Sequence, residues 1–207
     1  MLEVSQLTIT KGEYTLFDAL SFAISPGELV QIEGRNGTGK TTLLRLLIGL
    51  GQYDKGFIQW KGATIRSNRE EFHQDLLYIG HQTGIKPELT AFENLAFFCS
   101  MQRTTKLGNQ EIYDALLKVG LVGKEDIPVS KLSAGQQRRA ALARLWLSEQ
   151  ILWILDEPLT AIDKQGMQIL ESLFIQHTSK GGIVVLTTHQ DMFKNHPKLR
   201  KIRLGDS

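Results

Sequence analysis

A glycine-rich loop between a short apolar strand and a helix is the feature that most restricts how this chain can fold. The strand is predicted over residues 29–32, the loop spans residues 34–39, and helix formers dominate residues 40–50. In such a unit, backbone N–H groups of the loop and of the helix N-terminus surround phosphate oxygens. Chance would produce the pattern in only about one chain of this length in a hundred, so the segment predicts a phosphate-binding loop.

The residue types in this loop suit the phosphates of a nucleotide. The pattern is Gly34-x-x-x-x-Gly39-Lys40-Thr41, in which glycine removes side chains that would block the backbone. Lys40 is expected to place a positive charge on the β- and γ-phosphates, and the hydroxyl of Thr41 can ligate Mg²⁺. The predicted phosphate contacts are Gly34, Arg35, Asn36, Gly37, Thr38, Gly39, Lys40, Thr41 and Thr42.

An acidic pair, Asp156 and Glu157, ends the apolar run 151–155. A carboxylate at the C-terminal end of a parallel strand lies where open α/β sheets bind ligands, so Asp156 is suited to hold Mg²⁺ directly or through water. Glu157 points elsewhere because side chains alternate along a strand, and it can polarise a water that attacks the γ-phosphate. The alternative is that the pair only marks a strand end. The predicted phosphate-binding loop in the same chain favours the functional interpretation over this alternative.

A second helix start follows at Ser133, which is predicted to cap a helix that runs to residue 147. The N–H groups and the dipole at this helix start could hold a second anion. Two anion sites suggest one phosphate chain gripped from both sides. The alternative is an ordinary serine-capped helix, which any globular protein can contain.

Hydrophobic patterning predicts an α/β chain. Residues 2–9 and 57–60 alternate like half-buried strands, whereas the runs 151–155 and 183–186 are continuously apolar, as in parallel strands buried on both faces. Buried parallel strands that alternate with helices are typical of an α/β core.

The middle of the chain is predicted to be helical from about residue 85 to about residue 130. Thr90 and Glu93 form a capping box that opens one helix, and Asn109 is the predicted cap of a second. Apolar residues here cover more than one helix face: Leu89, Phe92, Leu95, Phe97 and Phe98. They either fill the core of this segment or dock a membrane subunit.

Composition excludes several classes of protein. The formal net charge of the 207-residue chain is +2, which by itself indicates no nucleic-acid partner. The one cysteine, Cys99, cannot form an internal disulfide and is expected to be buried. No apolar run reaches the roughly 18 residues that a membrane span needs. We therefore expect neither a membrane-spanning protein nor a disulfide scaffold.

In this order and spacing, the motifs resemble those of the ATP-binding-cassette ATPases over essentially the whole chain. The loop at 34–41 resembles their Walker A motif, 132–136 the signature motif, and 156–157 the Walker B motif with its catalytic glutamate. Gln82 resembles the Q-loop glutamine, residues 162–163 the D-loop and His189 the switch histidine. The resemblance implies one cassette over residues 1–207: an α/β P-loop NTPase core with an N-terminal antiparallel β subdomain and a helical subdomain inserted at 85–135.

The resemblance also implies roles for individual residues. Glu157, His189 and Gln82 would be catalytic, and Thr41, Gln82 and Asp156 would hold Mg²⁺. In a head-to-tail homodimer, the signature residues of one subunit would contact ATP bound to the other; these are Ser133, Gly135 and Gln136.

Two positions depart from the family pattern. Ala134 replaces the commoner second glycine of the signature, which adds one methyl group near the phosphate contact. The aromatic that stacks on adenine is expected near Lys11, where Tyr14 is the nearest candidate and Phe17 lies behind it.

Phrases around the motifs are more particular, at 80–82, 84–95, 132–139 and 143–147. They resemble the ATP-binding subunit of the cytochrome c biogenesis transporter, also called the haem exporter. This implies a peripheral ATPase on the cytoplasmic face of the bacterial inner membrane, paired with an integral membrane subunit like CcmB. ATP hydrolysis would drive haem export or release of a haem-loaded chaperone. The alternatives are a transporter with a different cargo, or a soluble nucleotide-gated cassette acting on ribosomes or DNA.

Several other side chains are expected to be structural. His81, beside Gln82, lacks the partners of a haem ligand. Three tryptophans are predicted to lie in the core or at lobe contacts: Trp60, Trp146 and Trp153. Solvated positions are predicted for His73, His177 and His196, and for the basic tail formed by Lys194, Lys198, Arg200, Lys201 and Arg203.

Overall fold

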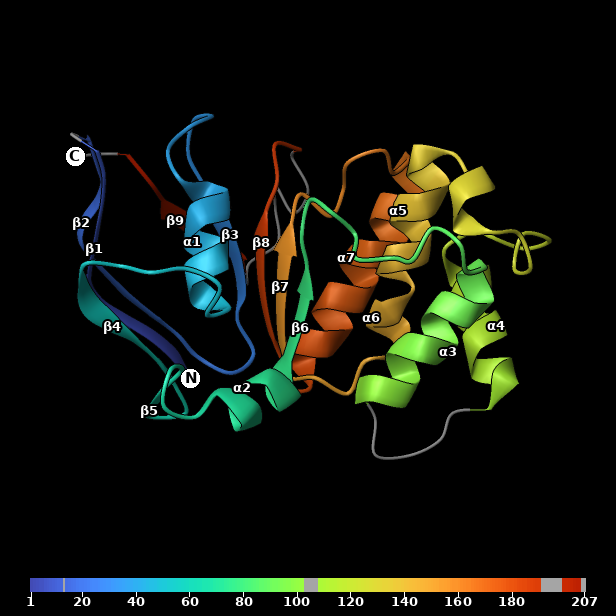
Figure 1. Cartoon of the computed structure of the whole chain (residues 1–207), viewed down its shortest axis with the longest axis horizontal. Helices are drawn as coiled ribbons and strands as arrows, with labels where there is room; N and C mark the ends of the chain where they lie inside the picture. The colour runs from blue at the N-terminus through green and yellow to red at the C-terminus, as the bar shows by residue number, and fades with distance from the viewer. Residues whose placement is uncertain (13, 103–107, 191–198, 206–207) are drawn as a thin grey trace. The chain divides into compact units, whose positions relative to one another are not determined.

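The computed structural model describes residues 1–12, 14–102, 108–190 and 199–205 (Figure 1). These residues form two compact units. The first combines Met1–Tyr78, Gln150–Asp156 and Phe174–Ser207, and the second combines Ile79–Glu149 and Glu157–Leu173. Among the described residues, no helix has the length and apolarity needed to cross a membrane.

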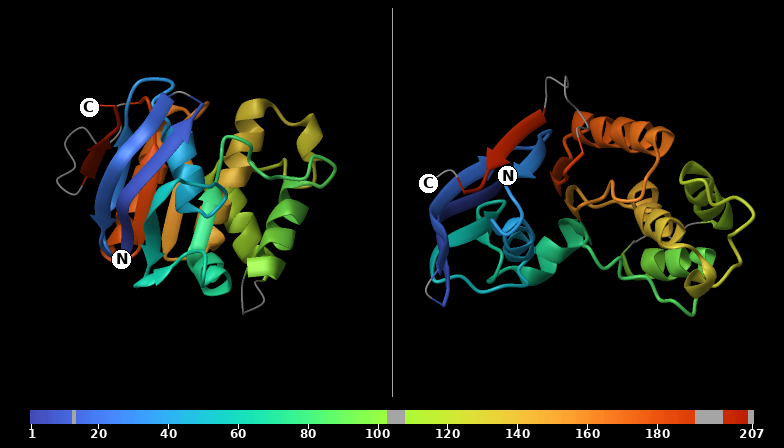
Figure 2. Two further views of the ribbon diagram at one scale, coloured as in Figure 1. Left: turned by 60° about the vertical axis from the view of Figure 1, so that its left-hand side comes forward. Right: turned by 90° about the horizontal axis from the view of Figure 1, so that it is seen from above.

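An antiparallel sheet of four strands opens the first unit. Its strands are β1 (Leu2–Lys11), β2 (Tyr14–Ile24), β4 (Lys55–Trp60) and β5 (Ala63–Thr64), in the order β2-β1-β4-β5. The alternation predicted for residues 2–9 and 57–60 is confirmed: Leu2 is buried between Ile24 of β2 and Trp60 of β4. Figure 2 shows β1 and β2 as a long paired ribbon.

A parallel sheet of five strands carries the glycine loop and Asp156, two of the predicted parts of the nucleotide site. It contains β3 (Leu29–Glu33), β6 (Leu76–Ile79), β7 (Leu152–Asp156), β8 (Ile183–Thr187) and β9 (Leu199–Arg203), in the order β6-β7-β8-β3-β9. Every residue of β7 and β8 is buried, as expected for inner parallel strands with both faces covered. The continuously apolar runs therefore predicted these two strands correctly.

Two helices of the first unit contribute side chains to the core that its sheets share. Helix α1 (Lys40–Leu47) lies between the two sheets (Figures 1 and 2), and its four leucines are buried in one core with side chains from both sheets. The helix ends three residues before the predicted limit because Gly49 adopts a φ of 78°. Helix α2 (Arg69–Asp75) adds the buried ring of Phe72 to this core.

Within the described residues, the predicted basic tail forms the edge strand β9, and its basic side chains, those of Arg200, Lys201 and Arg203, are exposed as predicted. In β9, Arg200 contacts Glu28 at 3.3 Å and Lys201 contacts Glu33 at 2.5 Å, while Ile202 is buried. A charged edge strand discourages further strand pairing. Lys194, His196 and Lys198 lie outside the described residues.

His177 also differs from its prediction as a solvated residue. Its ring stacks on Trp153 with centroids 3.7 Å apart and an angle of 10° between the planes. A ring nitrogen lies 3.2 Å from the carbonyl oxygen of Ile151. Burial lowers the pKa of His177 below its ordinary value of 6.5, and the charge of Lys180 acts in the same direction.

The second unit is mostly helical. It contains α3 (Ala91–Gln102), α4 (Asn109–Lys118), a 3₁₀ turn (Val129–Lys131), α5 (Ala134–Leu142), α6 (Arg144–Leu147) and the start of α7 (Lys164–Ser179). The capping box of α3 is confirmed, because the Thr90 hydroxyl accepts from the Glu93 N–H at 3.0 Å and the Glu93 carboxylate accepts from the Thr90 N–H at 2.8 Å. Leu95, Phe98 and Cys99 are buried, whereas Phe97 is 43% exposed.

Two helix boundaries in this unit differ from prediction. Helix α4 begins at Asn109, so Gly108 is its cap, and the Gly108 N–H donates to the Glu111 carboxylate at 2.8 Å. The helix predicted from Ser133 to residue 147 is two helices separated at Ala143. Neither glycine nor proline marks that break, so nothing in the local sequence predicts it.

Candidate nucleotide site

The glycine loop joins β3 to α1 in the first unit, and two of its glycines lie close to neighbouring side chains. Gly39 has a φ of 93°, in the left-handed region that favours glycine. A Cβ atom added to Gly39 would lie 2.8 Å from the side chains of both Leu16 and Phe17. One added to Gly34 would lie 2.5 Å from the hydroxyl oxygen of Thr38. Both glycines are therefore required by conformation and by packing.

Donors gather where the loop meets the helix. The ammonium of Lys40 donates to the carbonyl oxygens of Gly34 at 2.7 Å and Arg35 at 3.1 Å, so it lies against the loop. No acidic residue occupies the first turn of α1 to offset the positive end of its dipole. Thr41 is exposed in that turn. The ammonium of Lys40, the positive end of the α1 dipole and the exposed hydroxyl of Thr41 thus lie together where the sequence predicts phosphate contacts.

Asp156 is buried at the end of β7, with 2% of its surface exposed. Thr187, opposite it at the end of β8, donates its hydroxyl to Asp156 Oδ1 at 2.7 Å. The carboxyl ends of parallel strands meet at one edge of a sheet. This edge therefore brings together Asp156, the glycine loop after β3 and the exposed His189 beyond β8.

Glu157 and Gln82 line one pocket of about 610 Å³ in the second unit, together with Ala134, Gln137 and Arg138 of α5. Gln82 is exposed and Glu157 is half-buried. Glu157 has a φ of 50°, which is unusual for a residue with a Cβ atom and occurs disproportionately at functional sites. The structure thus unites these two predicted catalytic residues with the helix that follows the signature.

The start of α5 is a confirmed capping box. The Gln136 N–H donates to the Ser133 hydroxyl at 3.3 Å, and the Ser133 N–H donates to the Gln136 side-chain oxygen at 3.0 Å. Ser133 and Ala134 are exposed, and Gly135 is half-buried. The capping is therefore established, while contact of these residues with ATP stays a prediction.

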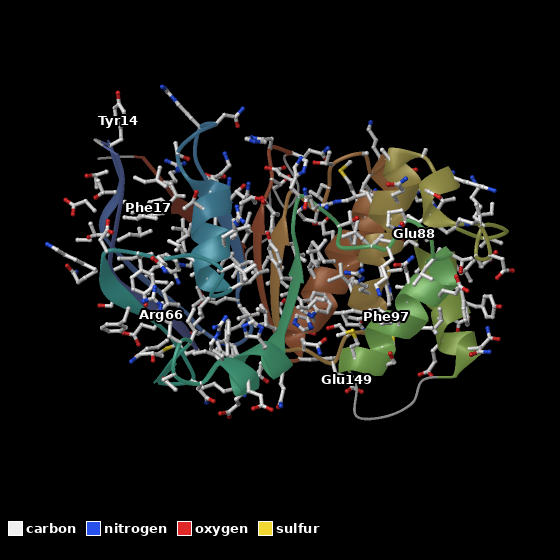
Figure 3. The ribbon with its side chains drawn as sticks, viewed as in Figure 1. Tyr14, Phe17, Arg66, Glu88, Phe97 and Glu149 are labelled. Carbon is white, nitrogen blue, oxygen red and sulfur yellow. The ribbon has the colours of Figure 1, made fainter. Side chains whose placement is uncertain are left out.

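The two aromatic candidates for adenine stacking lie in different surroundings. Tyr14 is 81% exposed and projects from the start of β2 (Figure 3). Phe17 is buried beside Gly39. Of the two, only Tyr14 presents a free ring face, and its adenine contact stays a prediction.

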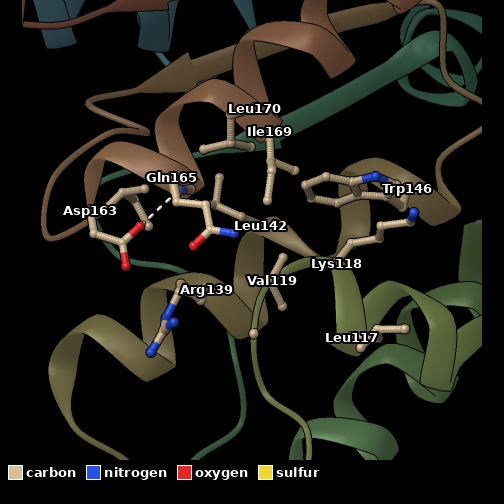
Figure 4. A pocket seen from close by; sticks show the side chains of 13 residues that line it. Leu117, Lys118, Val119, Arg139, Leu142, Trp146, Asp163, Gln165, Ile169 and Leu170 are labelled. Carbon is tan, nitrogen blue, oxygen red and sulfur yellow. Dashed lines mark hydrogen bonds between the residues drawn. The ribbon is translucent and has the colours of Figure 1, made fainter.

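The predicted D-loop contributes to a second pocket of the second unit, of about 170 Å³ (Figure 4). There Asp163 accepts the Gly166 N–H at 2.7 Å and so caps α7. Trp146 forms one wall and is half-buried, whereas Trp60 and Trp153 are core residues as predicted.

Sequence reasoning missed three residues that support the site. Thr187 holds Asp156, Arg138 donates to the carbonyl of Glu157, and Arg144 donates to the carbonyls of the loop that follows Gln82. The two arginines stand among helix residues of ordinary type, so only the tertiary contacts of their side chains distinguish them.

Comparison with known proteins is consistent with these observations. The sequence model of the ABC transporter family matches residues 17–160. The cytochrome c biogenesis ATP-binding export protein CcmA of Vibrio parahaemolyticus is 66% identical over 206 residues and covers all of both chains. The protein of the same name from Vibrio cholerae is 65% identical, covering 100% of this chain and 99% of its own, and that from Yersinia pestis is 58% identical, covering 100% and 94%.

Solved structures match over the same length. A dimeric post-hydrolysis state of the ATP-binding cassette MJ0796 bound to ADP and Pi has a TM-score of 0.83 at 24% identity, covering 100% of this chain and 95% of that one. An ATP-binding subunit of an ABC transporter has a TM-score of 0.83 at 23% identity, covering 99% and 88%. These matches confirm the predicted nucleotide-binding-domain fold. The chain therefore belongs to the ABC transporter family, as one of its ATP-binding ATPases.

Proposed function

We propose that this chain is the ATPase subunit of a bacterial ABC transporter that serves cytochrome c biogenesis. The observation that carries the proposal is 66% identity, over the full length of both chains, to a cytochrome c biogenesis ATP-binding export protein. ATP hydrolysis would be coupled to haem export or to release of a haem-loaded chaperone. The partner would be an integral membrane subunit like CcmB, which would hold the ATPase at the cytoplasmic face of the inner membrane.

In this proposal the glycine loop binds the phosphates of ATP. N–H groups of the loop and of the first turn of α1 donate to phosphate oxygens, and Lys40 exchanges its two carbonyl partners for the β- and γ-phosphates. The exchange costs little free energy, because the displaced hydrogen bonds end on neutral carbonyl oxygens, whereas the new ones join the ammonium to negatively charged phosphate. Tyr14 offers its exposed ring to the adenine.

Hydrolysis is assigned to residues at the edge of the parallel sheet and to residues of the pocket that α5 helps to line. Glu157 orients and polarises the attacking water, with Gln82 beside it in the same pocket. His189 contacts the γ-phosphate. The oxygen donors of Thr41, Gln82 and Asp156 are of the kind that Mg²⁺ prefers, so these residues would hold the ion. When bound, Mg²⁺ neutralises phosphate charge that develops during the reaction.

We further propose a head-to-tail homodimer in which each α5 start completes the other subunit's site. The exposed positions of Ser133 and Ala134 and the positive end of the α5 dipole support this arrangement. A structurally similar cassette is described as dimeric and bound to ADP and Pi. Residues 85–135 would act as the helical subdomain that meets the membrane subunit, and the exposed ring of Phe97 supports that role.

The proposal is tested with Glu157→Gln, which keeps the shape of the side chain and removes its charge. We expect ATP binding to persist, hydrolysis to fall by at least about 10²-fold, and an ATP-bound dimer to accumulate on size-exclusion chromatography. Lys40→Ala is the control, which should lose nucleotide binding and form no such dimer. Turnover by Glu157→Gln at the wild-type rate would refute the catalytic assignment.

The transporter assignment is tested by purifying the Glu157→Gln protein from its native membrane in mild detergent and identifying the proteins that accompany it. We expect an integral membrane subunit of the haem-delivery system. Recovery of a different membrane subunit would refute the cytochrome c role and leave the ATPase assignment intact. A protein that sediments with ribosomes or DNA would refute the transporter assignment itself.

A further inference from the structure

A buried arginine joins two predicted catalytic segments of the second unit. Arg138 lies on α5, five residues after Ser133, and is 7% exposed. One guanidinium nitrogen donates to the carbonyl oxygen of Gly80 at 2.7 Å and another donates to the carbonyl oxygen of Glu157 at 2.9 Å. Burying a cation is unfavourable unless its donors are satisfied, and the planar fork of arginine serves two acceptors at once.

The backbone that Arg138 contacts is held in an unfavourable conformation. Glu157 has a φ of 50°, a region that residues with a Cβ atom seldom adopt, and such a conformation persists only where surrounding contacts hold it. Its carbonyl accepts from Arg138 and from the Thr160 N–H at 3.2 Å. Because φ and ψ set the direction of the Cα–Cβ bond, these contacts also direct the carboxylate of Glu157.

The other acceptor of Arg138 provides the anchor. Gly80 immediately follows β6 and precedes Gln82 by two residues. The far side of the same loop is held by Arg144, which donates to the carbonyls of Thr83 at 3.2 Å and Gly84 at 3.0 Å. The loop is thus bonded to an arginine on each side of Gln82, and Arg138 ties it to Glu157.

From these contacts we propose that Arg138 is a positioning residue for hydrolysis, which holds Glu157 in its left-handed conformation by bridging it to Gly80. The inference rests on the proposed role of Glu157. Since Arg138 belongs to the helix that begins at Ser133, it also makes the position of Glu157 depend on that helix. A contact between Ser133 and a second subunit would therefore reach the catalytic carboxylate through Arg138.

The test is a double-mutant cycle between Arg138→Met and Glu157→Gln. Methionine keeps much of the buried apolar volume and removes both donors. We expect Arg138→Met to lower kcat by about 10²-fold, since a displacement of about 1 Å can have that effect. Affinity for a fluorescent ATP analogue should stay as in wild type. In the Glu157→Gln background, where no catalytic carboxylate remains to be positioned, the same substitution should cause no further loss in single-turnover rate.

Arg144→Met is the matched comparison, because it removes a half-buried arginine that also donates to two carbonyls, neither of which belongs to Glu157. Its effect should multiply with that of Glu157→Gln rather than vanish. Arg138→Lys, which can serve one carbonyl at a time, should recover part of the rate, and it replaces Arg138→Met in the cycle if that variant does not fold.

The outcomes separate the two proposals. An unchanged kcat for Arg138→Met, or an equal fold-loss with and without the Glu157 carboxylate, would overturn the positioning role. Wild-type turnover by Glu157→Gln alone would instead overturn the catalytic role of Glu157. Inactive Glu157→Gln together with a fully active Arg138→Met would leave the proposed function standing and remove only this inference.

Discussion

Replacing Gly39 by alanine should destabilise the protein more than the same change at Gly37, two residues earlier. Both glycines are left-handed, with φ values of 93° and 89°. An added Cβ at Gly37 meets no atom within 4 Å, whereas one at Gly39 lies 2.8 Å from the side chains of Leu16 and Phe17. The pair therefore separates backbone strain from steric overlap.

The expected free energies follow from these two terms. A left-handed alanine costs about 1–2 kcal/mol, which is the whole expected effect of Gly37→Ala. Gly39→Ala adds the cost of overpacking, about 1–3 kcal/mol. Phe17 is buried and cannot swing into solvent, so the overlap is not relieved without cost. For a protein of this size, the extra destabilisation corresponds to a lowering of Tm by roughly 2–12 °C.

The assay is urea unfolding followed by tryptophan fluorescence, without nucleotide, because ligand binding would add its own stabilisation. Gly39→Ala should have the lower unfolding midpoint and the same dependence on urea concentration. A third variant, Gly39→Ala with Leu16→Ala, should recover part of the loss by removing one overlapping side chain. Equal destabilisation by Gly37→Ala and Gly39→Ala would refute the packing argument.

Two further predictions concern buried polar contacts. Thr187→Val removes the 2.7 Å hydrogen bond to the carboxylate of Asp156 and should lower the free energy of unfolding by about 1.5–3 kcal/mol. Thr187→Ser keeps the hydroxyl and should recover most of it, and equal loss in urea melts of the two variants would contradict this account. Burial lowers the pKa of His177 from 6.5 in the folded state, so its stabilising contribution is complete above that pH and is lost as acidification protonates the unfolded chain first. His177→Phe, which keeps a ring against Trp153, should reduce the fall in Tm between pH 7 and pH 5, and an unaltered pH profile would count against the prediction.

Most elements whose signals are local could be predicted from the sequence. The alternation at residues 2–9, the apolar run that forms β8 and the capping box at Thr90 each depend on residues within a few positions of one another. So does the glycine loop, because its φ values are a property of glycine itself. Helix ends were predicted less accurately. Asn109 is the first residue of α4 and not its cap, because several neighbouring residues can satisfy the same helix end.

Elements that depend on distant partners escaped prediction. The basic side chains of β9 are exposed as predicted, but the strand itself and its ion pairs with Glu28 and Glu33 arise only because β9 lies beside β3. His177 looked like a solvated residue because its position against Trp153 depends on the packing of α7 on β7. For His177 the residue type favoured solvent, and tertiary contacts outweighed that preference.

By itself, the sequence predicted the chemistry that we propose for this protein, from a glycine loop suited to phosphate, a carboxylate pair at a strand end and a capped helix that resembles the family's signature. These are short motifs whose proposed function is inferred from residue type and spacing. The tertiary structure decided what supports that chemistry. Asp156 is held by Thr187, 31 residues away, and Glu157 is tied through Arg138 to Gly80, 58 residues from that arginine. Hydrogen bonds across such separations leave no periodic trace in a sequence, because the fold alone brings donor and acceptor together.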